Sequence, residues 1–189
     1  MLYLFISYAI PMVWAVMSAL FPAFVALLPD LTPIITIVSM GLALYGFTIL
    51  RTEGAYFRKA QVFEILLIVI NLISITFSKN NPPESYIVSH GTLFIVFGIV
   101  QMALSWYMKF LTGQSIREME RHRNIDIGGK ALEKVILIEI TVLTLGYIFL
   151  HIYAPIGLLL SLLALIANAV AVYFLYKTYI MSRKIPGIK

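Results

Sequence analysis

Six long apolar runs divide the chain, and short polar or proline-containing segments separate them. A membrane-spanning helix needs about 20 mainly apolar residues, and the six runs meet or approach that length. They predict an all-α fold with a single transmembrane domain over 1–189, whose spans lie at about 2–28, 31–50, 61–77, 86–108, 134–153 and 156–176. Pro11 and Pro22 lie inside the first run and predict a kink or a break in that helix, because proline removes a backbone donor.

The segment 112–133 is the one sizeable polar stretch between the apolar runs. Ser115 and Glu118 have the spacing of a capping box, which marks the start of a helix. Ile116 and Met119 would fall on one side of the helix that follows. The pattern predicts a short amphipathic cytoplasmic helix, which either lies on anionic headgroups or docks a cytoplasmic partner.

Composition indicates an integral membrane protein. The chain is 61% hydrophobic and only 12% charged, whereas a soluble domain is about a quarter charged. So few charged side chains cannot cover a water-soluble body of this size. The absence of cysteine excludes disulfides and thiolate metal sites.

The basic residues predict the orientation. With six spans, thirteen of the fourteen Lys and Arg side chains fall on one face, and only Lys79 falls on the other. The positive-inside rule makes the basic face cytoplasmic, so both termini are expected in the cytoplasm and the cell membrane is the expected location. Insertion bias and anionic lipid at the cytoplasmic face explain the net charge of +5, and no nucleic-acid partner is predicted.

Seven ionisable or amide side chains in the apolar runs are candidates for a site, because such groups are costly at membrane depth and by default indicate one. They form three layers, with two acids near the cytoplasmic end, three amides near the midplane and two histidines near the outer face. In that order they are Glu64 and Glu139; Asn71, Gln101 and Asn168; His90 and His151.

Helical spacing places several of these groups on shared faces. Glu64 and Asn71 are seven residues apart, and His90 and Gln101 are eleven apart, so each pair lies on one side of its helix. If the polar sides of these helices face a common interior, they form a polar column from the cytoplasmic acids to the outer histidines. The alternative is that the amides hold helices together by interhelical hydrogen bonds, each contributing about 0.6–2 kcal/mol.

No catalytic residue is predicted. The chain lacks a glycine-rich phosphate loop, an HExxH motif and a GxSxG motif, so an enzyme is not favoured. His90 and His151 lie at similar predicted depth on antiparallel helices and could ligate a haem or a metal ion. No third ligand is evident, and pH-sensitive gating or an ordinary interfacial place are the other interpretations, so no cofactor or metal site is predicted.

Two hypotheses follow for function. In the first, the chain is a carrier or channel for a small solute or ion: the two glutamates couple protons or cations, the three amides contact solute, and the two histidines lie at the outer mouth. In the second, it is a non-catalytic subunit of a larger respiratory, secretion or transport complex, with other membrane subunits or further copies of itself as partners. A haem- or metal-binding redox subunit is a third and less favoured class.

The predicted topology resembles that of the substrate-binding subunits of energy-coupling vitamin transporters. Those proteins have six spans, about this length and both termini inside. Their first helix often carries small residues four apart, and Ala15, Ala19 and Ala23 repeat that spacing. Such spacing is common wherever membrane helices pack closely, and the resemblance covers topology only.

Overall fold

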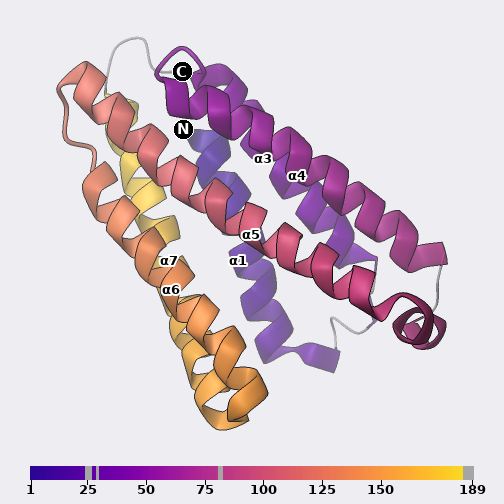
Figure 1. Cartoon of the computed structure of the whole chain (residues 1–189). Helices are drawn as coiled ribbons and strands as arrows, with labels where there is room; N and C mark the ends of the chain where they lie inside the picture. The colour runs from indigo at the N-terminus through magenta and orange to yellow at the C-terminus, as the bar shows by residue number, and fades with distance from the viewer. Residues whose placement is uncertain (24–26, 29, 81–82, 185–189) are drawn as a thin grey trace.

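The computed structural model describes residues 1–23, 27, 28, 30–80 and 83–184, without the side chains of 77–80, 83–97 and 151. Within these residues the fold is all-α, as predicted, and six helices follow one another along the chain (Figure 1). They are α1 (Leu2–Leu20), α3 (Leu31–Leu50), α4 (Ala55–Asn80), α5 (Pro83–Arg123), α6 (Gly129–Ile152) and α7 (Ala154–Ser182).

The described helices form a closed ring. Each packs against the helices before and after it in the chain, and α7 closes the ring against α1. Figure 1 shows the first residues of α1 and the last turns of α7 at the same end of the molecule. Most of the fully buried apolar side chains also lie towards this end, among them Phe47, Phe57, Leu111, Ile127 and Leu175. The helices are therefore packed most tightly at the end that carries both termini.

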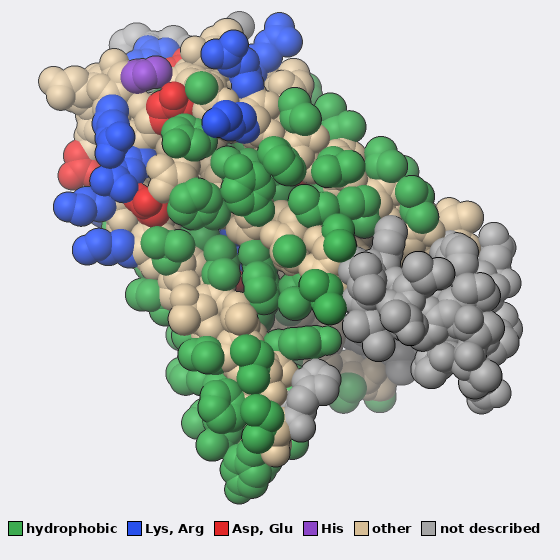
Figure 2. Space-filling model, in the orientation of Figure 1, with side chains coloured by type: hydrophobic (Ala, Val, Ile, Leu, Met, Phe, Trp, Pro, Cys, Tyr) green, Lys and Arg blue, Asp and Glu red, His purple; other side chains and the backbone are tan. Residues whose placement is uncertain are grey.

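Four of the described helical segments are long and apolar enough to cross a membrane: Leu2–Leu20, Leu31–Leu50, Ala55–Thr76 and Ala154–Ser182. Large apolar side chains cover their outer surfaces, as on α7, where Leu158, Leu159, Leu162 and Ile166 are each more than half exposed. Figure 2 shows that charged side chains gather at the end of the molecule where α5 ends and α6 begins, whereas apolar side chains cover the rest of this face. This surface fits an integral membrane protein, because lipid is the solvent that favours such a belt.

The helix α5 differs from the sequence prediction. Residues 86–108 and the short helix expected after Ser115 belong to one continuous helix of 41 residues, and Ser115, Ile116 and Met119 are fully buried. The Ser115 hydroxyl donates to the carbonyl of Leu111, at 2.7 Å, so its hydrogen bond stays within the helix. The predicted surface helix is therefore wrong: these residues form a wall of the packed end of the ring.

Carboxylates from the end of α5 cap the helices on either side. Glu118 accepts the N–H of Tyr56, at 2.9 Å, at the start of α4. Glu120 accepts the N–H groups of Ile127 and Gly129, at 2.8 and 2.6 Å, at the start of α6. The first turn of a helix has unpaired N–H donors and a positive end of its dipole, so these carboxylates explain why α4 and α6 both begin earlier than the apolar runs suggested.

Two ion pairs connect the end of α5 to its neighbours. Arg123 binds Glu53 through Nε and an Nη atom, at 2.9 and 2.6 Å, and Arg117 binds Glu133, at 2.5 Å. These pairs tie the end of α5 to the α3–α4 turn and to α6. Glu53 raises the pKa of the Arg123 guanidinium.

The first helix is shorter than predicted. It ends at Leu20 with Phe21 as its C-cap, because the residue before a proline is disfavoured in the helical conformation and Pro22 follows. Pro11 lies inside the helix without ending it. Having no N–H, Pro11 leaves the carbonyl of Ser7 without its helical donor.

Gly157 permits a close approach of the backbones of α6 and α7. A methyl group at this position would lie 2.5 Å from the backbone nitrogen of Leu150, at the turn between α6 and α7. We expect Gly157→Ala to lower the free energy of unfolding by about 1–3 kcal/mol, because the two backbones must separate. SDS titration of the purified protein in mixed micelles measures this. Gly41→Ala is the matched control, since nothing lies within 4 Å of its added methyl group, and an equal loss in both variants would contradict the assignment.

Candidate functional site

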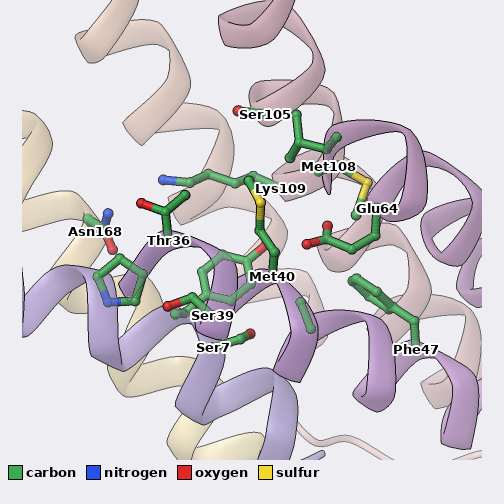
Figure 3. Close-up of a pocket in the computed structure, with 14 residues that line it drawn as sticks. Ser7, Thr36, Ser39, Met40, Phe47, Glu64, Ser105, Met108, Lys109 and Asn168 are labelled. Atoms are coloured by element: carbon green, nitrogen blue, oxygen red, sulfur yellow. The ribbon is translucent and has the colours of Figure 1, made fainter. Parts of the chain in front are cut away.

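A cavity of about 250 Å³ lies inside the ring, between α1, α3, α4, α5 and α7. Met108, Leu67 and Phe47 line it and also belong to the buried core, so the packed, charged end of the molecule closes one side. Figure 3 shows side chains from separate helices converging on this space. Its polar lining residues are Ser7, Tyr8, Thr36, Ser39, Glu64, Ser105, Lys109 and Asn168.

Glu64 is the most consequential of these side chains. It lies in the third turn of α4, is only 4% exposed and extends towards Met40 and the cavity (Figure 3). Within the described part of the chain it forms no hydrogen bond or ion pair. An isolated carboxylate in such surroundings is strongly disfavoured while it is ionised. It must therefore be neutral, or it must hold a cation that comes from outside the chain.

Lys109, another residue on the lining, forms an ion pair with Glu139. Lys109, on α5, lines the cavity and donates to the Glu139 carboxylate on α6. The side chains are 24% and 4% exposed, so the acid is enclosed while the lysine keeps contact with the cavity. The ammonium group of Lys109 therefore has Glu139 as its partner, whereas Glu64 has no partner among the described residues.

Tyr8 reaches across the ring from α1 to α5. Its hydroxyl donates to the Thr112 hydroxyl, at 2.9 Å, and Thr112 donates in turn to the carbonyl of Met108, at 2.9 Å. Tyr8 also lines the cavity. This chain of hydrogen bonds holds α1 in place where the cavity meets the packed core.

Several oxygen acceptors on the lining are left open. The Asn168 Oδ1 atom is buried and has no hydrogen-bond partner among the described residues, although a buried polar atom normally has one. The carbonyl of Ser7 lacks its helical donor because of Pro11, and both residues line the cavity. Together with Glu64, these groups make a lining suited to a ligand that is positively charged or donates hydrogen bonds.

The predicted polar column is divided in the structure. Glu64 and Asn168 line the cavity, and Glu139 reaches it through Lys109. Gln101 and Asn71 lie outside the lining and bind each other: the Gln101 Nε2 atom donates to the Asn71 Oδ1 atom, at 2.7 Å. This bond joins α4 to α5, as the interhelical alternative for the amides describes.

The bond between Gln101 and Asn71 allows a direct test of that role. We expect Gln101→Leu to lower the free energy of unfolding by about 0.6–2 kcal/mol, because it leaves the Asn71 oxygen unpaired. Asn71→Leu/Gln101→Leu should recover most of the loss, since neither polar partner remains. Unfolding in mixed micelles measures both variants. A double variant less stable than the single one would contradict an isolated pair.

The prediction of an outer histidine layer stays untested. The side chains of His90 and His151 lie outside the described residues. Among the residues that are described, no group of three or more His, Cys, Asp or Glu side chains is placed to hold a metal ion.

Five polar lining residues were not predicted from the sequence: Ser7, Tyr8, Thr36, Ser39 and Lys109. Lys109 lies at the end of an apolar run, where an interfacial lysine needs no partner. The signal for Lys109 is Glu139, an acid within an apolar run that needs a counter-charge.

A scan against models of protein families, a search of curated proteins and a search of solved structures found no match to this chain.

Proposed function

We propose that this chain is a multi-pass carrier for a small cation, which includes protons and protonated amines. The Glu64 carboxylate, which has no partner among the described residues and is buried at a cavity inside a ring of helices, is the observation that carries the proposal. A cation at Glu64 would neutralise this carboxylate, because the ammonium group of Lys109 is already paired with Glu139. Asn168 and the Ser7 carbonyl would supply further oxygen ligands, the type that hard cations prefer.

The proposed topology has six spans with both termini in the cytoplasm. The ring supports it, because six successive antiparallel helices return the chain to the side on which it began. The positive-inside rule then assigns the charged end to the cytoplasm, and the cell membrane is the membrane we propose. In this orientation the packed core lies between the cavity and the cytoplasm, so a transport cycle requires that core to open.

The test is electrical recording from proteoliposomes on a solid support. Purified protein is challenged with Na⁺, K⁺, protons and small protonated amines, one at a time and at constant ionic strength. At least one of them should produce a current above that of protein-free liposomes. Equal traces from both kinds of liposome for every cation would overturn the proposal.

A subunit role is the second candidate, and the surface of α1 favours it. Ala15 and Ala19 of α1 are exposed, and so is Ala23, which follows the end of that helix, whereas small residues four apart in membrane helices usually lie at a helix–helix contact. A further subunit would supply that contact. Extraction in mild detergent, followed by mass spectrometry of what co-purifies, distinguishes the two: a monodisperse lone species that carries current favours the carrier.

A further inference from the structure

A second hollow, of about 560 Å³, lies at the charged end of the molecule. It is formed by the α3–α4 turn, the first turns of α4 and the last turn of α5. Arg51, Arg58 and His122 line it together with Thr52, Gly54, Ala55 and Glu118.

The two arginines of this pocket are unpaired. Arg51 and Arg58 are exposed, and within the described residues neither forms an ion pair. Glu118 is the one carboxylate on the lining, and it is engaged with the N–H of Tyr56. By contrast, Arg117 and Arg123 each have a glutamate partner. The pocket therefore keeps two guanidinium groups available.

Geometry adds to the charge. Arg51 is the C-cap of α3 and Arg58 lies in the first turn of α4, so a short turn holds both on one side of the hollow. His122 comes from α5 and adds a ring nitrogen; its Nδ1 atom lies 3.2 Å from the carbonyl of Glu53. A guanidinium group can bind a phosphate through two parallel hydrogen bonds.

We propose that this pocket binds a phosphate group. In the topology proposed above it lies at the level of the cytoplasmic headgroups, so the group comes either from an anionic phospholipid or from a free phosphate compound. The site is independent of the cavity and of transport. The sequence predicted contact with anionic lipid at 112–133. Because Arg117 and Arg123 in that segment are paired, the proposal moves this contact to Arg51 and Arg58.

The experiment uses the full chain in detergent micelles at constant ionic strength. Dioleoyl phosphatidic acid, dioleoyl phosphatidylcholine and inorganic phosphate are titrated separately, and binding is measured by native mass spectrometry and by the thermal unfolding midpoint. Arg51→Gln/Arg58→Gln removes the two pocket arginines. Lys130→Gln/Lys177→Gln is the matched control, because it removes the same charge from exposed positions away from the pocket.

Phosphatidic acid should bind and stabilise the wild type, and the arginine variant should bind it at least about tenfold more weakly. The lysine control should stay within about threefold, as expected for general screening. Binding of phosphatidic acid alone identifies a lipid headgroup, whereas competition by inorganic phosphate identifies a site that also takes free phosphate. Equal weakening in both double variants, or equal binding of phosphatidylcholine, would overturn the proposal.

Discussion

Lys109→Met is expected to lower the free energy of unfolding by about 3–5 kcal/mol, because it leaves the Glu139 carboxylate buried without its counter-charge. Methionine keeps the length and apolar stem of the lysine, so the change is one of charge. The side chain of Glu139 is only 4% exposed, and water cannot replace the lost ammonium group. SDS titration in mixed micelles measures the difference.

Removing the charge of Glu139 instead should cost less stability. Glu139→Gln leaves an amide oxygen that can still accept from Lys109, whose side chain is 24% exposed and reaches the cavity. We expect a loss of about 1–2 kcal/mol, typical of a charged hydrogen bond replaced by a neutral one. A larger loss of stability in Lys109→Met than in Glu139→Gln would therefore show that Glu139 is the more enclosed partner.

The double variant completes the cycle. Lys109→Met/Glu139→Gln removes both charges, and we expect it to be more stable than Lys109→Met alone. A coupling energy of about 2 kcal/mol or more between the two positions would match a buried pair. Additive losses, with no coupling, would show that the pair is open to solvent and adds nothing measurable, as many surface pairs do.

Features that depend on one helix at a time were predictable from the sequence. The α3 boundaries, 31–50, were predicted as the structure has them, because Pro33 and the apolar run are local signals. The tight turn between α6 and α7 also follows from local residues: Tyr153 is extended and Pro155 lies in the first turn of α7. The position of Glu64 in a helix long and apolar enough to cross a membrane was predictable from the apolar pattern around it.

Features that depend on how helices meet were not predictable in the same way. Ser115 and Glu118 have capping-box spacing, yet Glu118 caps another helix, α4, by accepting from Tyr56, which lies 62 residues earlier in the chain. The spacing cannot distinguish a local acceptor from a distant one. Likewise, Glu64 and Asn71 share a stripe of α4 by periodicity, but Asn71 faces Gln101 on α5 while Glu64 faces the cavity. The rotation of each helix within the ring decides this, and the period of one helix does not encode it.

Glu64, which lines the cavity, permits the sharpest test of function. Glu64→Gln should abolish cation-driven current, with a loss of at least about 100-fold, because the amide cannot neutralise a bound cation, and a lost charge pair of about 3 kcal/mol corresponds to that factor. Glu64→Asp should keep part of the activity, since the charge remains on a shorter side chain. Recording from proteoliposomes measures all variants. Asp126→Asn is the matched control, because it removes one negative charge at an exposed position outside the cavity.

Stability should move in the opposite direction to transport. Glu64 has no counter-charge within the described residues, so Glu64→Gln removes an enclosed, unsatisfied carboxylate and should raise the free energy of unfolding by about 1 kcal/mol or more in the absence of ligand. A residue kept for packing would show the reverse, a loss of stability when it is replaced. Lost current with gained stability is therefore the signature of a side chain retained for binding at a cost to the fold. If Glu64→Gln instead unfolds as easily as Lys109→Met, or carries full current, Glu64 is a structural group and the cation site lies elsewhere.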